Sequence, residues 1–160
     1  MFKRTLLIAI SAAGFGMAGA AYAGVDLESA GTCISDAMGS GTSPVSCIET
    51  AQIDCSTIPE DTPAVAQLCY SEAKDAWSEG IAASMQALKD SAPADALSIS
   101  QIEAKYDILA GFLQCDRMEE LSLAVSDISS DKIATQKAHC AATASGLAYA
   151  RLLWRVQSLQ

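Results

Sequence analysis

The chain has 160 residues and a formal charge of −9, with 19 Asp and Glu against 10 Lys and Arg. This acidic balance argues against nucleic-acid binding, which needs a basic face for phosphates, and an apolar fraction of 51 % excludes a disordered chain. The length fits one domain, since domains commonly contain about 100–150 residues. The single histidine leaves few ligands for a zinc enzyme. We expect no metal or other cofactor, although a haem or lipid in a helical groove stays open.

Residues 1–23 have the pattern of a secretory signal peptide. Lys3 and Arg4 form a short positive region, an apolar run follows, and Ala21-Tyr22-Ala23 is a small-x-small cleavage pattern. A membrane anchor is the alternative, but the apolar run is short and interrupted by glycines. No cysteine stands at the cleavage point, which argues against a lipoprotein. We therefore expect a periplasmic or secreted protein, free of the membrane, formed by one cysteine-rich helical domain over residues 24–160.

The expected mature chain is more acidic than the whole. Removal of residues 1–23 leaves 8 Lys and Arg against 19 Asp and Glu, a net charge of −11. Such a charge favours cationic partners through long-range attraction. The alternative is that an acidic surface only keeps a helical protein soluble.

Six cysteines in an exported chain favour disulfide bonds. They are Cys33, Cys47, Cys55, Cys69, Cys115 and Cys140. No C-x-x-C pair is present, so neither a thioredoxin-like motif nor a zinc knuckle is indicated. His139 precedes Cys140, but neighbours on a helix point in different directions. A structural cysteine beside a surface histidine is therefore favoured over a thiol–imidazole pair.

Apolar residues recur every three or four positions, which predicts an all-α, disulfide-stapled bundle of about five helices. The first helix is expected over residues 26–38, and a short second segment begins at Pro44 and passes through Cys55. Thr62 is a good N-cap for a third helix from Pro63 to about residue 90, because proline is tolerated at the first helical position. Trp77 lies on the apolar stripe of that helix and is expected in the core.

Two further helices complete the prediction. Ser100-Gln101-Ile102-Glu103 fits a capping box, so a fourth helix is expected to start there, after a break around Pro93. Its apolar residues are Tyr106, Leu109, Phe112, Cys115, Met118, Leu121 and Val125. After a break at residues 127–131, a last helix is expected from about Lys132 towards Leu159.

The breaks between these helices suggest which cysteines pair. Each of three turns has a cysteine on either side, and a disulfide needs two Cα atoms within about 7 Å, which hairpin neighbours can meet. We expect the sequential pairs Cys33–Cys47, Cys55–Cys69 and Cys115–Cys140. Cross-pairing among the first four cysteines is the alternative.

The cysteines and one tryptophan helix stand in a characteristic order. The residues are Cys33, Cys47, Cys55, the Cys69-Tyr70-Ser71-Glu72 stretch, Trp77, Ile81, Leu88, Cys115 and Cys140. This order resembles the LprI-like lysozyme-inhibitor family of bacterial periplasmic proteins, in particular its six-cysteine members. The polar signature of the family is partly replaced, because Ala82 and Met85 stand where it has Asn and Tyr, and Gly111 stands where it has Arg.

The resemblance implies a periplasmic protein that binds lysozyme-type muramidases without catalysis. Many lysozymes are cationic, so exposed acidic residues are the candidate contacts. They are Asp54, Glu60 and Asp61, together with a cluster of Asp116, Glu119 and Glu120. The alternative interpretation of both groups is that they are solvated helix ends.

Two other functional classes remain. A non-inhibitory envelope adaptor or scaffold is favoured by the replaced signature residues, and salt separates it from an electrostatic inhibitor, which should weaken at high ionic strength. An enzyme is disfavoured: Glu119 and Glu120 are adjacent and point apart on a helix, and no serine motif accompanies His139.

Overall fold

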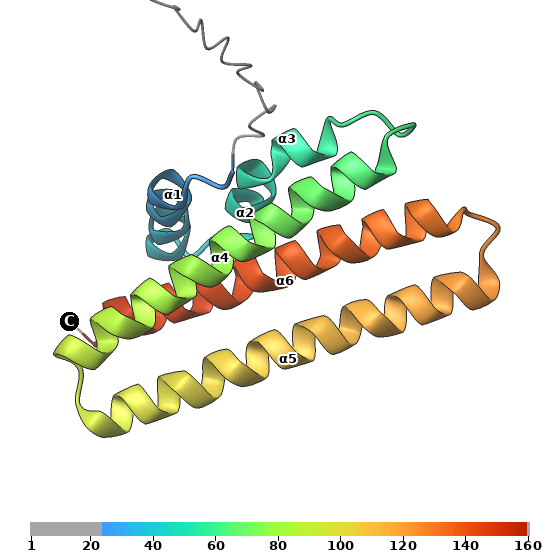
Figure 1. Cartoon of the computed structure of the whole chain (residues 1–160). Coiled ribbons are helices and arrows are strands. Elements are labelled where there is room, and N and C mark those ends of the chain that lie inside the picture. Colours follow the sequence, from blue (N-terminus) through green and yellow to red (C-terminus); the bar gives the residue numbers. More distant parts are fainter. Residues whose placement is uncertain (1–23, 160) are drawn as a thin grey trace, which may run out of the picture.

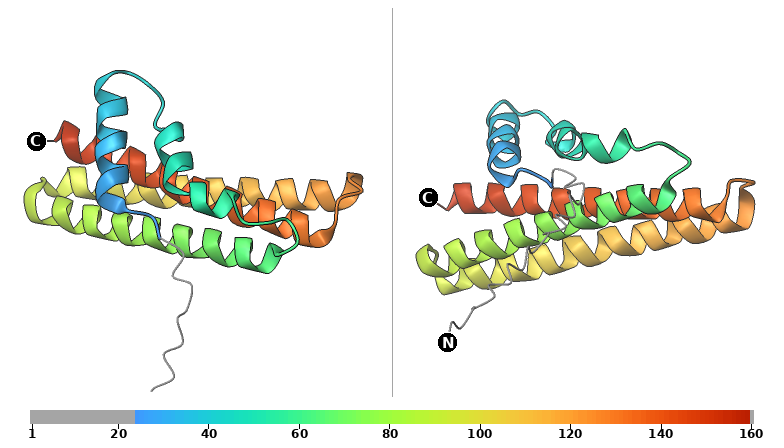
Figure 2. Two further views of the ribbon diagram at one scale, coloured as in Figure 1. Left: turned by 90° about the horizontal axis from the view of Figure 1, so that it is seen from above. Right: turned by 45° about the horizontal axis from the view of Figure 1, so that its top comes forward.

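Three helices of 29 to 32 residues lie side by side and form the body of the molecule (Figure 1). They are α4 (Pro63–Ser91), α5 (Ala94–Val125) and α6 (Ser130–Ser158). The shorter helices are α1 (Leu27–Gly39), α2 (Val45–Ala51) and α3 (Ile53–Ser56). These three lie on one side of α4 and α6, and α1 stands across the long helices (Figure 2).

This computed structural model describes residues 24–159, so the predicted signal peptide lies outside the described residues. Over that range the prediction of an all-α bundle is confirmed. The short segment predicted from Pro44 through Cys55 divides at Gln52 into α2 and α3, which explains why six helices are observed instead of about five.

Two of the six helices, α1 and α6, begin at a residue whose side chain caps the helix. Asp26 caps α1, because its Oδ1 accepts hydrogen bonds from the backbone N–H groups of Glu28 and Ser29 at 3.1 and 3.2 Å. Thr62 occupies the N-cap position of α4, as predicted, but its side chain does not cap the helix. Its hydroxyl instead donates to the backbone carbonyl of Pro59 at 2.9 Å.

The predicted start of the fourth helix at Ser100 is wrong, since α5 begins at Ala94, directly after Pro93. Proline ends the preceding helix, and Asp95 in the first turn of α5 suits the positive end of the helix dipole. Ser100 therefore lies inside the helix, where its hydroxyl donates to the backbone carbonyl of Ala96 at 2.9 Å. A residue in that position cannot form a capping box.

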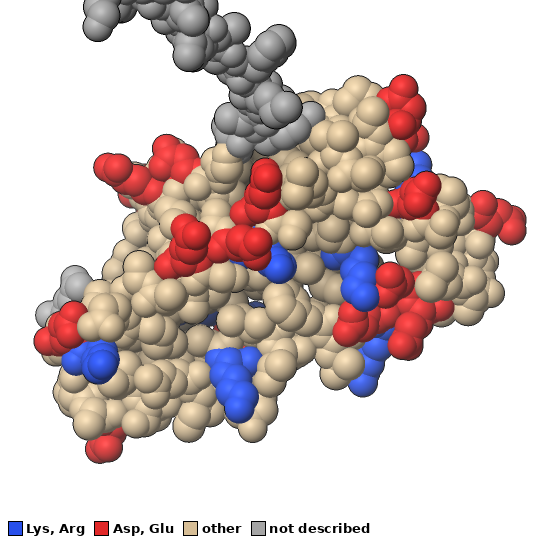
Figure 3. Space-filling view, viewed as in Figure 1, with Lys and Arg blue, Asp and Glu red and all other residues tan. Residues whose placement is uncertain are grey.

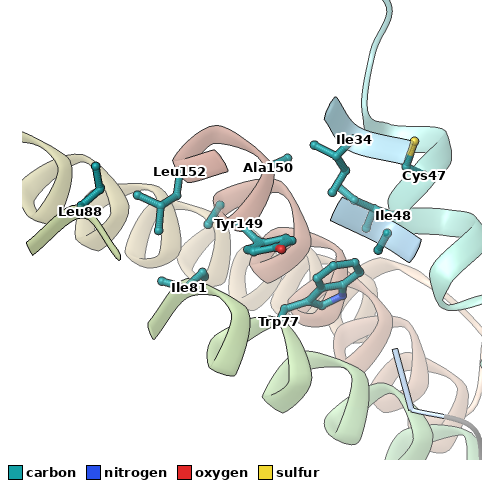
Figure 4. Packing of buried hydrophobic residues seen from close by; sticks show 11 residues of the cluster. Ile34, Cys47, Ile48, Trp77, Ile81, Leu88, Tyr149, Ala150 and Leu152 are labelled. Atoms are coloured by element: carbon teal, nitrogen blue, oxygen red, sulfur yellow. The ribbon is translucent and has the colours of Figure 1, made fainter. Parts of the chain in front are cut away.

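The main core lies where α4, α6 and the short helices meet (Figure 4). Trp77 is fully buried, as predicted, and its ring faces Tyr149 on α6. Ile34 from α1 and Ile48 from α2 are also fully buried, so the short helices seal this core from one side. Burial of large apolar side chains such as these is the principal stabilising contribution to a domain of this size.

All three predicted disulfides are confirmed. Cys33–Cys47 joins α1 to α2, Cys55–Cys69 joins α3 to α4, and Cys115–Cys140 joins α5 to α6. Disulfides persist in oxidising compartments, so they support an extracytoplasmic location. From residue 24 to residue 159, no helix is both long enough and apolar enough to cross a membrane.

Candidate functional site

The N-terminal part of the described chain contains acidic residues but no basic ones. Residues 24–73, which include α1 to α3 and the first turns of α4, contain no Lys or Arg. They contain eight exposed carboxylates: Asp26, Glu28, Asp36, Glu49, Asp54, Glu60, Asp61 and Glu72. We call residues 24–73 the acidic segment. Figure 3 shows acidic side chains spread over this part of the molecule, above α4, with few Lys or Arg side chains among them.

Two disulfides anchor the acidic segment. The disulfide Cys33–Cys47 fixes α1 against α2, with the two Cα atoms 5.8 Å apart. The disulfide Cys55–Cys69 fixes α3 against α4, with a Cα–Cα distance of 5.5 Å. The carboxylates are therefore presented on a preformed surface, which reduces the ordering cost of binding a partner.

Two hollows are bordered by these acids. Asp26, Glu28 and Asp36 border a shallow, open hollow of about 800 Å³ between α1 and α2. Glu60 and Asp61 border a second cavity of about 540 Å³ between the starts of α4 and α6. Both hollows offer space for basic side chains of a partner next to carboxylates.

Three of the six predicted contact residues, Asp54, Glu60 and Asp61, lie together on α3 and the loop to α4. The side chain of Glu60 is 90 % exposed, and its Oε1 lies 3.4 Å from Nζ of Lys132. Among the described residues, Glu60 is the only member of the acidic segment in an ion pair, and a pair this exposed contributes little. These carboxylates remain available to a partner.

The other three predicted contacts lie elsewhere, on α5, and two of them share a single lysine as their ion-pair partner. Nζ of Lys137 lies 2.9 Å from Oδ1 of Asp116 and 2.6 Å from Oε2 of Glu119. The hydrogen bond from Lys137 to Glu119, followed by the one to Asp116, raises the pKa of Lys137 to about 12. Glu120 is exposed. The structure therefore separates the six predicted residues into a group on α3 and the following loop and a group on α5 whose charge is partly compensated by one lysine.

His139 and Cys140 do not form a thiol–imidazole pair. Cys140 is bonded to Cys115, and all six cysteines are in disulfides. The ring of His139 lies against that of Tyr70, with centroids 4.8 Å apart, and both residues line the cavity beside Glu60. Burial raises the pKa of Tyr70. In residues 24–159 no group of three or more metal-ligating side chains comes together.

An apolar groove between α5 and α6 was missed by the sequence analysis. It has a volume of about 500 Å³ and is lined by Ile102 and Tyr106 from α5 and by Trp154 from α6. Trp154 is 64 % exposed, in contrast to the buried Trp77. We call this feature the end groove, because it lies near the C-terminal end of α6.

Two ion pairs border the end groove. Arg151 pairs with Asp107, and Nε of Arg155 lies 3.0 Å from Oε2 of Glu103. The acids stand four residues apart on α5 and the arginines four residues apart on α6, which is the spacing of one helix face. The matched spacing is visible in the sequence, but it indicates a contact only once α5 and α6 are known to pack antiparallel.

No family model, curated protein or solved structure matches this chain.

Proposed function

We propose that this protein is an exported, non-catalytic binding protein that recognises a cationic protein through its acidic segment. The observation that carries the proposal is the presence of eight exposed carboxylates, and no Lys or Arg, in residues 24–73. Uncompensated charge of one sign on a rigid surface attracts an oppositely charged partner and speeds its association.

The partner class that we propose is a lysozyme-type muramidase in the periplasm. The resemblance to LprI-like inhibitors in cysteine order supports this choice, and so do the three disulfides, which suit an extracytoplasmic compartment. Residues 24–159 carry a net charge of −11, which favours a basic enzyme over a neutral one. The hollows beside Asp36 and Asp61 offer space for basic side chains at the rim of the enzyme's cleft.

The second candidate is an envelope adaptor that binds without inhibition. It is favoured by the end groove, an exposed apolar feature that an electrostatic inhibitor does not need. Apolar binding persists at high salt, whereas binding through exposed charges is screened within about 8–10 Å at physiological ionic strength. Salt dependence therefore separates the two candidates.

The test is titration of the oxidised protein into a cell-wall turbidity assay with cationic lysozymes, at low and high salt. We expect dose-dependent protection that fades as salt rises. The variant Asp54→Lys/Asp61→Lys should weaken protection about tenfold, because it reverses two available charges. The control Asp90→Lys/Asp127→Lys changes the net charge equally, at two exposed acids outside the acidic segment and outside the other predicted contacts, and should have a much smaller effect.

Three results decide the proposal. Equal weakening by both double variants would mean that only total charge matters and that the acidic segment is not the binding surface. Protection that persists at high salt would favour the apolar groove. Absence of protection with every lysozyme class would reject inhibition and leave the adaptor function.

A further inference from the structure

Helix α5 is held on one side only. It packs chiefly on α6 through small residues, among them Ser100, Ala104, Gly111 and Cys115. A Cβ atom added at Gly111 would lie 2.8 Å from Cβ of Ala144, so the two helices approach closely there. In Figures 1 and 2, α5 forms an outer edge of the molecule, and no other helix covers its far side.

That far side carries a second apolar stripe. It consists of Ile99, Ile102, Tyr106, Leu109 and Leu113, which are between 50 % and 65 % exposed. The spacing alternates between three and four residues, as in the seam of a coiled coil. With 3.6 residues per turn, these side chains point away from the small residues that pack on α6, with Ile102 and Tyr106 at the edge nearest the end groove. We call this set the α5 stripe.

We propose that the α5 stripe is the interface between two copies of this chain, packed antiparallel about Tyr106. Isolated exposed apolar residues are ordinary on a protein surface, but a continuous row about 21 Å long marks an interaction site. A two-fold axis at Tyr106 places the stripe of one copy against the same stripe of the other, as in an isologous dimer.

The charges at the two ends of the stripe support the antiparallel orientation. Asp95 and Arg117 are each eleven residues from Tyr106, which is close to three helical turns, so all three lie on one line along α5. Both end residues are exposed, and within the described residues neither makes an ion pair. Antiparallel packing places Asp95 of each copy near Arg117 of the other, whereas parallel packing would oppose like charges.

The area of the stripe is sufficient for a dimer. Five side chains that are half or more exposed offer roughly 100 Å² each, or about 500 Å² per copy. Two copies would then bury about 1,000 Å² in total, an area that separates biological interfaces from ordinary lattice contacts and that fits a reversible dimer. The end groove adjoins the stripe through Ile102 and Tyr106, so Trp154 lies beside the proposed interface.

Salt distinguishes this dimer from the binding proposed above. Residues 24–159 of each copy carry a net charge of −11, so the two copies repel one another at long range. Screening by salt should strengthen association through the α5 stripe. Binding of a cationic partner to the acidic segment should weaken under the same conditions, and the two proposals therefore stand or fall independently.

The experiment is sedimentation of the oxidised full chain over a range of concentrations, with thermal unfolding as a check on folding. The wild type should form dimers, and Leu109→Glu should weaken dimerisation at least about tenfold, because it places a charge in the apolar interface. The matched control is Leu68→Glu on α4, where the leucine is 56 % exposed against 53 % for Leu109, and it should not alter dimerisation.

A charge swap tests the orientation. Asp95→Arg alone and Arg117→Asp alone should each weaken the dimer, and the double swap should restore it, because the opposite charges then meet again. A chain that is monomeric at every concentration, or a dimer insensitive to Leu109→Glu, would overturn the interface. A dimer disrupted by Leu109→Glu but unaffected by both single swaps would overturn the antiparallel orientation.

Discussion

The rings of Trp77 on α4 and Tyr149 on α6 lie with their centroids 5.6 Å apart and their planes tilted by 37°. Each ring also covers a glycine on the opposite helix. A Cβ atom at Gly80 would lie 2.9 Å from Cε2 of Tyr149, and a Cβ atom at Gly146 would lie 3.1 Å from Cε2 of Trp77. The two glycines bring α4 and α6 close enough for the rings to meet.

Gly146→Ala should therefore destabilise the protein. Its new methyl group would lie 2.7 Å from Cγ2 of Ile48, and overpacking of this kind costs about 1–3 kcal/mol, which exceeds the gain in helix propensity. Gly39→Ala is the control, because nothing lies within 4 Å of its Cβ position, and it should be neutral or stabilising by up to about 1 kcal/mol. Urea unfolding measures the stability of both variants. If the two variants were equally stable, the close approach of α4 and α6 at Gly146 would be contradicted.

Truncation of the two tryptophans should change the stability of the protein to very different extents. Trp77→Ala removes a fully buried ring from the core and should cost about 3–5 kcal/mol of unfolding free energy. Trp154→Ala removes a ring that is 64 % exposed and should change the stability of the monomer by only about 0.5 kcal/mol. Thermal unfolding of dilute samples, where Trp154 cannot contribute to a dimer, makes the comparison. Equal losses would mean that Trp154 also supports the core.

Removal of the Cys115–Cys140 disulfide should loosen α5 specifically. The double variant Cys115→Ala/Cys140→Ala should lose about 3 kcal/mol, since the closed loop spans 25 residues and α5 is held by α6 alone along most of its length. Hydrogen exchange should accelerate in α5 more than in α4. The control Cys33→Ala/Cys47→Ala opens a loop of 14 residues and should leave exchange in α5 nearly unchanged. Uniform acceleration in both variants would count against local release of α5.

Alkaline pH should destabilise the fold. The pKa of Lys137 is raised from 10.5 to about 12, so its stabilising contribution is complete below pH 10.5 and is lost as pH rises through 12. Burial also raises the pKa of Tyr70 and Tyr149 above 10, and deprotonation then favours the unfolded chain. Urea unfolding between pH 9 and 12 should show the fall in stability. Tyr149→Phe should make the fall shallower, and an unchanged slope would exclude that tyrosine as a contributor.

The sequence predicted the disulfides because each pair flanks a turn, and turn chemistry is local. Trp77 was also predicted correctly, since α4 has one apolar face and its periodicity is unambiguous. The core face of α5 was predicted wrongly because this helix is apolar on two sides. Of the seven apolar residues predicted to follow one another along it, only Cys115 is buried, and Tyr106 is among the most exposed side chains.

The candidate site was predicted less well than the fold. Asp54, Glu60 and Asp61 are exposed and close in sequence, and such a local group can be recognised from the chain alone. The compensation of Asp116 and Glu119 depends on Lys137, which comes from another helix, so the chain order alone does not indicate it. The end groove likewise requires knowledge of how α5 and α6 are placed.

The connectivity of the disulfides has a consequence for biogenesis. The first cysteine is bonded to the second, the third to the fourth and the fifth to the sixth, and no bridge crosses another. A polypeptide that emerges amino end first from a secretion channel therefore presents every thiol with its correct partner before the next pair arrives. We therefore expect oxidation in the order of emergence to yield the native bridges, with little demand on an isomerase.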